Sequence, residues 1–213
     1  MADASEDLAG LLRRVRLLPV LTITELAHAV PLARALCEGG LPVLEVTLRT
    51  PVAEDAARAI MAEVPEAIVG LGTLLAPADL ERAVALGARF AVSPGATPEL
   101  LAAAASSRVL FLPGVATPSE AMRARDAGFA LQKFFPAEAA GGVAALRSLA
   151  APLPGLAFCP TGGIGPHNVR DYLALPNVVA AGGSWLAHEG ELVAAAWARI
   201  RDRAAEARRL ASG

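Results

Sequence analysis

One lysine stands out in a chain that otherwise carries its positive charge on arginine. Lys133 is the only lysine among 213 residues, and it lies within Phe129–Glu138, an apolar and aromatic run that predicts a buried strand. Lysine is rarely buried unless it is paired or used, and burial disfavours the charged ammonium. A neutral amine can attack a carbonyl, whereas arginine does not deprotonate in proteins. Lys133 is therefore a candidate nucleophile; the alternative is a leftover lysine whose stem lies in the core and whose head reaches water.

A second candidate group is a polar stripe along the expected strand 42–48. Glu45, Thr47 and Arg49 alternate with the apolar residues Leu44, Val46 and Leu48. Because alternate residues of a strand point to opposite faces, one face of this strand is polar and the other apolar. Glu45 could transfer protons, and Arg49 could hold a substrate carboxylate through two hydrogen bonds. The alternative is that this face is exposed to solvent, but every other expected strand is apolar.

The elements that would position these residues alternate regularly along the chain. After a helix at 5–16, eight apolar runs bounded by turn residues predict strands at 17–23, 42–48, 67–73, 90–94, 109–113, 130–136, 156–161 and 178–183. The patterns between and after them predict helices at 25–38, 52–63, 77–86, 98–106, 118–127, 140–149, 166–175 and 189–209. Eight strand–helix units predict one domain over 1–213: an α/β (β/α)8 TIM barrel with an extra N-terminal helix. An open doubly wound sheet is the alternative, weakened because its glycine-rich fingerprint after the first strand is missing.

Several helices carry start and stop signals. Threonine followed by proline predicts helix starts at Thr50, Thr97 and Thr117, and Glu120 would complete a capping box with Thr117. Glycines at 39–40, 87 and 128 mark helix ends.

Small and glycine-rich segments close several of the expected strands, where a barrel carries its reactive residues. The third strand ends in Thr73, and the fourth ends in Ser93-Pro94-Gly95. The last two end in Thr161-Gly162-Gly163 and Gly182-Gly183-Ser184. Glycines let backbone N–H groups approach an anion, and hydroxyls add donors, so these two segments predict a phosphate site. The alternative is two tight turns that bind nothing.

Composition excludes several classes of function. The net charge of −2 offers no attraction to nucleic acid or to a membrane surface. No apolar run approaches about 20 residues, and the acidic N-terminus lacks the layout of a signal peptide. Cys37 and Cys159 suit free thiols in a reducing cytoplasm. His28, His167 and His188 lack the spacing of metal ligands, so no metal and no cofactor are expected.

At this point the motifs resemble those of bacterial 2-keto-3-deoxy-6-phosphogluconate (KDPG) aldolase, a family grouped with 4-hydroxy-2-oxoglutarate (KHG) aldolase. The resemblance runs from Pro19 to about Ala187, and it depends on segments 43–50, 68–73, 93–95, 133–138, 159–163 and 182–185. It implies a metal-independent class I lyase that assembles as a homotrimer. The implied reaction is reversible cleavage of 2-dehydro-3-deoxy-6-phosphogluconate to pyruvate and glyceraldehyde 3-phosphate, the last step of the Entner–Doudoroff route.

The resemblance also implies a role for each matching residue. Lys133 would form the Schiff base and Glu45 would be the general acid and base. The substrate-binding residues would be Arg49, Thr73, Pro94, Phe135, Thr161, Gly162, Gly163, Gly182, Gly183 and Ser184. The sequence departs from the family in two places. Thr22 and Ile23 stand where some relatives carry an arginine, and Leu71 stands where alanine is common, so that it would trim the pocket or repack the interior.

Three other functions remain open from the residues. The main substrate could be 4-hydroxy-2-oxoglutarate or the galactonate-derived epimer. The chain could be a barrel that binds a phosphorylated metabolite without reacting. It could also be a sugar-phosphate isomerase or epimerase that uses Glu45 as a base. The last two predict that Lys133→Gln or Lys133→Met leaves function largely intact, whereas the aldolase predicts a collapse of turnover.

Overall fold

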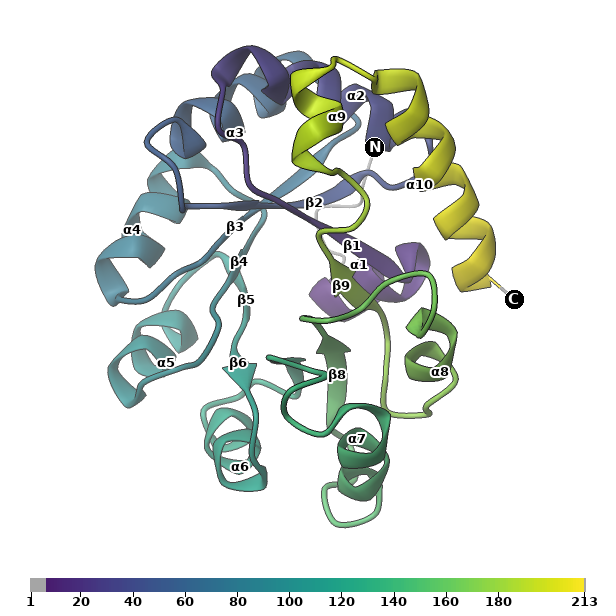
Figure 1. The fold of residues 1–213 in the computed structure, drawn as a ribbon. Helices are drawn as coiled ribbons and strands as arrows, with labels where there is room; N and C mark the ends of the chain where they lie inside the picture. The colour runs from purple at the N-terminus through teal and green to yellow at the C-terminus, as the bar shows by residue number, and fades with distance from the viewer. Residues whose placement is uncertain (1–6, 213) are drawn as a thin grey trace.

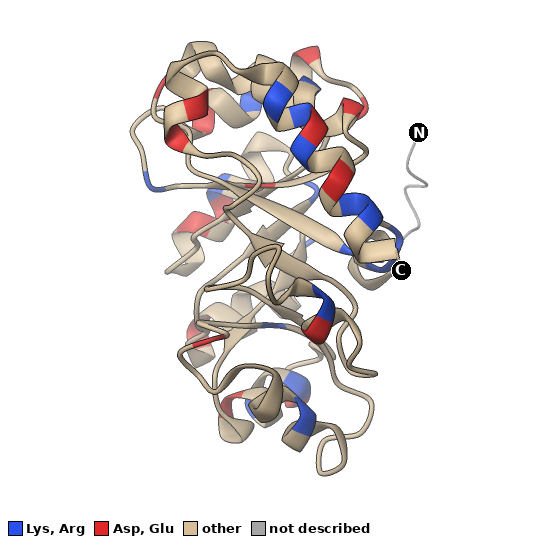
Figure 2. Ribbon diagram, turned by 45° about the vertical axis from the view of Figure 1, so that its right-hand side comes forward, with Lys and Arg blue, Asp and Glu red and all other residues tan. Residues whose placement is uncertain are grey.

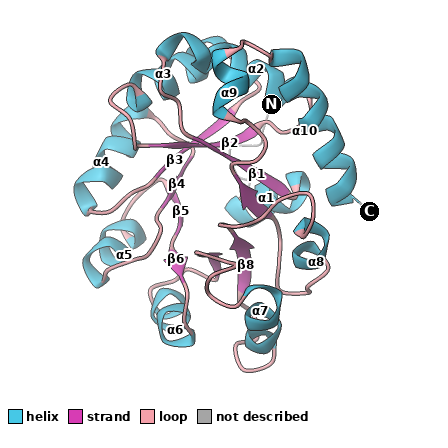
Figure 3. Ribbon diagram, in the orientation of Figure 1, coloured by secondary structure: helices cyan, strands magenta, loops and turns pink. Residues whose placement is uncertain are grey.

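Parallel strands form the centre of the molecule, and helices surround them (Figure 1, Figure 3). The computed structural model describes residues 7–212. One sheet follows the order β5-β4-β3-β2-β1-β9 and the other the order β6-β7-β8. The strands of the first are β1 (Leu17–Leu21), β2 (Val43–Thr47), β3 (Ile68–Gly72), β4 (Phe90–Val92), β5 (Leu110–Leu112) and β9 (Ala181–Gly183). Those of the second are β6 (Gly114–Val115), β7 (Leu131–Phe134) and β8 (Ala157–Pro160).

Helices follow nearly every strand, as the predicted alternation requires. They are α1 (Leu8–Val15), α2 (Ala29–Glu38), α3 (Ala53–Glu63), α4 (Pro77–Leu86), α5 (Pro98–Ala105), α6 (Pro118–Asp126), α7 (Gly142–Ala150), α8 (Val169–Leu173), α9 (Glu189–Val193) and α10 (Trp197–Ser212), with the short 3-10 helix η1 (Leu26–His28) before α2. The sequential strand order is that of an α/β half-barrel rather than a doubly wound sheet. Among residues 7–212, no helix is long and apolar enough to cross a membrane.

The two sheets adjoin at both of their edges. Pro113 separates β5 from β6 along the chain, and it has no N–H to donate to a strand ladder. At the other edge, isolated bridges pair Phe158 with Val178 and Thr161 with Gly182, so the end of β8 lies beside β9.

Two separate apolar clusters lie on the two faces of the strands. The larger one, between strands and helices, includes Leu44, Val46, Leu71, Phe134 and Phe158. The smaller one lies on the opposite, inner face and consists of Leu8, Leu12, Val15, Leu18, Val43, Phe90, Val92, Leu112, Cys159, Val179 and Ala180. Helix α1 supplies three of its members, so the extra N-terminal helix packs against the inner face; its expected start at residue 5 lies outside the described residues.

The alternation predicted for the second strand is confirmed, and Leu71 is reassigned. Leu44 and Val46 face the helices, while Val43 belongs to the inner cluster and Glu45 and Thr47 share its side of the strand. Leu71 packs with the outer cluster. The expectation that Leu71 would trim the pocket or repack the interior is therefore wrong. The ribbon of Figure 2 shows most of the charged residues on the outer helices. Glu45 and Lys133 differ, because both lie on strands and are buried.

The predicted helix over 189–209 is wrong. It divides into α9 and α10, and Ala195 between them has a φ of +48°. The guanidinium of Arg203 donates to both carboxylate oxygens of Glu191. These residues are 12 positions apart, which is about 18 Å along a straight helix, so the pair can form only because the chain bends. The hydrogen bonds from Arg203 also hold the pKa of Glu191 below its ordinary value.

Two of the three predicted threonine caps are confirmed, and one is wrong. Thr97 accepts from the N–H of Leu100, and Thr117 and Glu120 form the capping box of α6. The Thr50 hydroxyl instead donates to the Ile23 carbonyl at 2.6 Å, and α3 begins three residues later. The Thr50 hydroxyl is therefore engaged by the Ile23 carbonyl and does not cap α3.

Candidate active site

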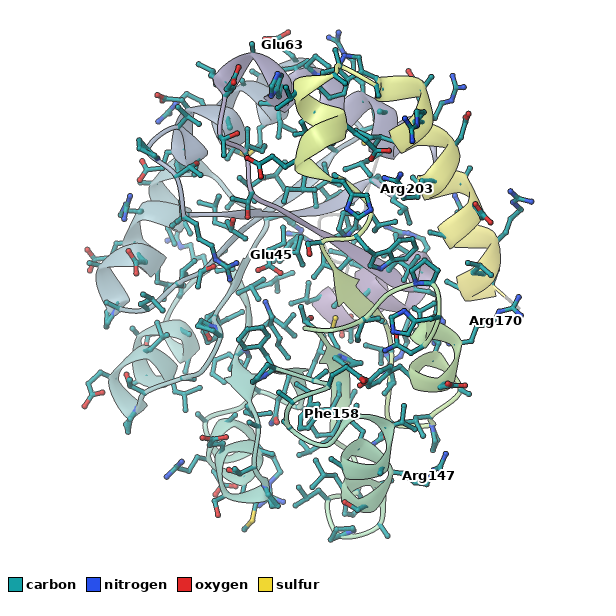
Figure 4. All side chains as sticks on the ribbon, viewed as in Figure 1. Glu45, Glu63, Arg147, Phe158, Arg170 and Arg203 are labelled. Atoms are coloured by element: carbon teal, nitrogen blue, oxygen red, sulfur yellow. The ribbon has the colours of Figure 1, made fainter. Side chains whose placement is uncertain are left out.

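Lys133 and Glu45 form a buried ion pair between the two sheets. The Lys133 Nζ lies 3.2 Å from Glu45 Oε1 and 3.4 Å from Oε2. The side chains are only 5% and 1% exposed. Figure 4 places Glu45 near the centre of the molecule, whereas Arg147 and Glu63 lie at its periphery. A charged pair at this depth is costly unless both partners are satisfied, and such pairs concentrate at functional sites.

Two glycines on β3 leave room for the side chain of Glu45. Gly70 is the register partner of Glu45, and Gly72 follows two residues later on the same face. A β-carbon on Gly72 would collide with Glu45 Oε1, and one on Gly70 would collide with the ring of Phe90. The two glycines therefore let a carboxylate and an aromatic ring occupy the interior side of β3.

Cys159 and Phe135 border the amine. Cys159 is the register partner of Lys133 on β8 and is fully buried. Burial raises the pKa of Cys159 to about 12, an effect that nearby Lys133 opposes, so this thiol stays protonated near neutral pH. The ring centroid of Phe135 lies 5.4 Å from Lys133 Nζ. Phe135 follows Lys133 by two positions, which predicts that both point to the same side, and its ring does lie beside the amine.

Arg49 and Thr73 meet at the carboxyl ends of β2 and β3. The Arg49 Nε donates to Thr73 Oγ1 at 3.0 Å, and Arg49 is exposed. On the other side of β2, Thr47 donates to the Leu21 carbonyl at 2.9 Å and lies 3.0 Å from the Thr22 hydroxyl. Because the Thr47 proton is used, Thr22 donates to Thr47 and keeps acceptor capacity. Thr22 thus presents a hydroxyl at the end of β1.

Pro94 is half-buried at the end of β4 and lies beside β6. A β-carbon on Gly114 would collide with the Pro94 carbonyl carbon, and the Gly114 N–H donates to Ser93 Oγ at 3.2 Å. Gly114 is in turn the register partner of Lys133. The Ser93-Pro94-Gly95 turn is therefore held one strand away from the amine.

The segment Thr161-Gly162-Gly163 turns sharply at the end of β8. Gly162 and Gly163 have φ angles of +101° and +77°, which favour glycine. Thr161 is buried, and a β-carbon on Gly182 would collide with its Oγ1. Gly182 and Gly183 pair with Leu18 and Pro19 of β1, and Ser184 follows them with an exposed side chain. The structure thus brings the two predicted glycine segments side by side.

Two further residues lie beside this turn and were not among the predicted site residues. Glu138 and Tyr172 are joined by a hydrogen bond beside the glycine turn. The only signals available were the position of Glu138 after the lysine run and the fact that Tyr172 is the sole tyrosine of the chain. Within the described part of the chain, no group of three or more His, Cys, Asp or Glu side chains could hold a metal ion.

The fold and the site together define an α/β protein with an amine–carboxylate pair buried among parallel strands and glycine turns beside it. The family model that matches residues 8–203 is described as KDPG and KHG aldolase. The KHG/KDPG aldolase of Escherichia coli (strain K12) is 53% identical over 189 residues, which are 89% of this chain and 89% of that protein.

Solved structures agree with this match. A KDPG aldolase from Legionella pneumophila, with pyruvate captured as a covalent carbinolamine intermediate, has a TM-score of 0.91 and 43% identity, covering 93% of this chain and 96% of that chain. The aldolase of Zymomonas mobilis ZM4 with 3-phosphoglycerate has a TM-score of 0.86 and 43% identity, covering 92% and 94%. The chain belongs to the KDPG and KHG aldolase family, and it is an aldolase.

Proposed function

We propose that this protein is a class I aldolase that cleaves 2-dehydro-3-deoxy-6-phosphogluconate to pyruvate and glyceraldehyde 3-phosphate. The observation that carries the proposal is the buried contact between Lys133 and Glu45, an amine next to a carboxylate in a chain with no other lysine. The aldolases of the same family that match this chain, one solved with covalently captured pyruvate, support it.

The first half of the reaction forms the Schiff base. Glu45, at 3.2 Å, accepts a proton from the ammonium of Lys133. The free amine attacks the C2 ketone of the substrate and gives a carbinolamine. Glu45 then returns its proton to the departing hydroxyl, water leaves, and a C2 iminium remains as an electron sink.

The second half breaks the C3–C4 bond. A carboxylate at Glu45 takes the proton of the C4 hydroxyl, so that the C4 oxygen becomes the aldehyde of glyceraldehyde 3-phosphate. The bonding electrons pass to the iminium and give an enamine. Glu45 then delivers its proton to C3, which becomes the methyl group, and water releases pyruvate and Lys133. One carboxylate thus serves as base and acid in turn.

The remaining residues hold the two ends of the substrate. Arg49, oriented by Thr73 and exposed, supplies a guanidinium for the C1 carboxylate. Pro94 and Phe135 bound the pocket around the reacting carbons, and Thr161 lies near the hydroxylated part. Gly162, Gly163, Gly182, Gly183 and Ser184 bind the phosphate through N–H and hydroxyl donors.

We further propose that the two sheets form one closed (β/α)8 barrel in a single domain over 1–213. The isolated bridges Phe158–Val178 and Thr161–Gly182 near the ends of β8 and β9, and the one-residue break between β5 and β6, support closure. We also propose a homotrimer, a cytoplasmic location and a place in the Entner–Doudoroff route, as the family resemblance implies. Pyruvate and a phosphorylated keto acid are then its small-molecule partners, without nucleic acid, membrane or cofactor.

The test is turnover of wild-type protein and Lys133→Met, with pyruvate release followed by a coupled dehydrogenase. We expect the substitution to reduce kcat by at least about 10⁴-fold, the scale of losing a covalent nucleophile, while circular dichroism shows a folded protein. A chelator should leave the wild-type rate unchanged. Retained pyruvate release in Lys133→Met would contradict a Schiff base at Lys133. A wild-type protein that releases no pyruvate but isomerises a sugar phosphate, and keeps this activity in Lys133→Met, would favour the isomerase.

A second candidate substrate is 4-hydroxy-2-oxoglutarate (KHG), because the description of the family also names it. The unphosphorylated 4-hydroxy-2-oxoglutarate would use the same lysine and carboxylate but no phosphate contact. Comparing kcat/KM for this substrate, the phosphogluconate and its galactonate epimer ranks the three.

A further inference from the structure

Glu138 is an acidic residue beside the glycine turn that the proposed chemistry does not use. It lies at the surface, five residues after Lys133, between β7 and α7. A β-carbon on Gly163 would lie 2.5 Å from its Cγ, so the side-chain stem covers Gly163. A carboxylate next to an anion site is unfavourable for anion binding, so this placement requires another reason.

The backbone around Glu138 donates hydrogen bonds to carbonyl groups of the Thr161–Gly163 turn. The N–H of Ala137 donates to the Thr161 carbonyl at 2.8 Å, and the N–H of Glu138 donates to the Gly162 carbonyl at 3.1 Å. The Asn168 side-chain amide donates to the Gly163 carbonyl at 3.1 Å. All three carbonyls of the turn therefore have partners.

The N–H groups of the same turn are left free. Within residues 7–212, the N–H groups of Gly162 and Gly163 donate to no protein acceptor. Neither glycine carries a side chain of its own that could cover its N–H group. In this turn the carbonyl groups accept hydrogen bonds from the protein and the N–H groups do not donate to it. Such free N–H groups can bind an anion.

Tyr172 fixes Glu138 in this position. Tyr172 is fully buried in α8, and its hydroxyl bonds to Glu138 Oε1. Burial, and then the carboxylate of Glu138, raise the pKa of Tyr172 above its ordinary value. The hydroxyl therefore remains the donor and the carboxylate the acceptor. Gly142, at the start of α7, leaves room for both groups, because a β-carbon there would lie 3.2 Å from the Tyr172 hydroxyl.

We propose that Glu138 and Tyr172 are positioning residues that hold the Gly162–Gly163 turn in the shape that receives the substrate phosphate. The pair does not touch the reacting carbons, and Glu138 contributes through its position rather than its charge. This inference depends on the proposed function, because it deepens the role of the phosphate end of that site.

The experiment measures KM and kcat for the phosphogluconate substrate and for its unphosphorylated counterpart. Tyr172→Phe removes one oxygen and keeps the buried ring. We expect KM for the phosphorylated substrate to rise about tenfold, equivalent to about 1.4 kcal/mol, with little change for the unphosphorylated one. Exchange of pyruvate methyl protons in deuterated water should remain at the wild-type rate.

Three variants complete the design. Asn177→Ala is the matched control, because Asn177 is buried and its amide donates to the Leu146 carbonyl of α7 without touching the turn. We expect it to lower stability and leave KM unchanged. Glu138→Gln keeps an oxygen that accepts from Tyr172 and should retain the wild-type KM or improve it, whereas Glu138→Ala should resemble Tyr172→Phe.

The outcomes are distinct. Equal KM values for wild type and Tyr172→Phe, or an equal loss in Glu138→Gln and Glu138→Ala, would overturn the positioning role. Were Ser184→Ala to lose the phosphate preference while Tyr172→Phe retained it, this inference alone would fail. A wild-type protein that shows no preference for the phosphorylated substrate would overturn both the inference and the proposed phosphate site.

Discussion

The reacting centre and the glycine turn of the site are built from different parts of the chain. In the proposed reacting centre, the side chains of Lys133 and Glu45 meet from the two sheets and are almost fully buried. The turn at Gly162 and Gly163 has no side chain to offer and presents backbone N–H groups instead. The contrast indicates that substitutions at the first should change the chemical step, while those at the second should change binding.

The largest effect that separates the two regions is expected from Glu45→Gln. A neutral amide cannot accept the proton of the C4 hydroxyl or deliver one to C3. We expect kcat to fall by about 10²- to 10⁴-fold, the range for loss of a general acid–base group, with a smaller loss in Schiff-base formation. Exchange of pyruvate methyl protons in deuterated water measures this step, and unchanged exchange would remove Glu45 from the proton-transfer role.

Gly72→Ala tests whether the position of the Glu45 carboxylate matters as much as its presence. The added β-carbon would collide with Glu45 Oε1. A displacement of about 1 Å can cost about 10²-fold in rate, and we expect kcat to fall on that scale. Gly190→Ala is the control, because a β-carbon there meets nothing within 4 Å. Equal rates for the two variants would show that Glu45 adapts without loss.

Ser184→Ala tests the glycine-rich region that is proposed to bind the phosphate. Loss of one hydroxyl donor to a charged group costs about 1.5–3 kcal/mol, so KM for the phosphorylated substrate should rise about tenfold or more. The unphosphorylated substrate should be little affected, and kcat should remain near the wild-type value. Equal changes for both substrates would place Ser184 outside the phosphate site.

The smallest effect concerns the helix behind the reacting centre. The N–H of Ala116, with Thr117, holds the pKa of Glu120 below its ordinary value. Glu120 therefore stabilises the fold above about pH 4.3, its ordinary value, and this contribution is lost as the pH falls through the lowered pKa. We expect Glu120→Gln to lose less than about 1 kcal/mol at pH 7 and nothing near pH 2, measured by urea unfolding. An equal deficit at both pH values would contradict this assignment.

Much of this contrast could be predicted from residue types. The lone lysine within an aromatic run predicted that Lys133 is buried, and the polar stripe of Glu45, Thr47 and Arg49 predicted an inward Glu45; the structure pairs Lys133 with Glu45. Glycine pairs after the last two strands placed the turn. These predictions depended on burial and on strand period, which are local properties of a sequence.

Other features depend on contacts between distant segments. Three consecutive alanines at 194–196 favour a helix, yet the chain bends there, and the Glu191–Arg203 pair bridges α9 and α10. Thr50 has the chemistry of a cap but bonds to Ile23. The link between Glu138 and Tyr172 joins residues 34 positions apart. Tertiary contacts override local preference in the first two cases, and the third is a contact that no local pattern encodes.

The most direct test of the central claim is reduction with borohydride after incubation with pyruvate, followed by intact mass measurement and peptide mapping. Because the chain has one lysine, the only other amine is that of the N-terminus. The account predicts a single reduced pyruvyl adduct on the peptide that contains Lys133, and none in Lys133→Met. An adduct confined to the N-terminal amine, or none at all, would contradict a Schiff base at Lys133.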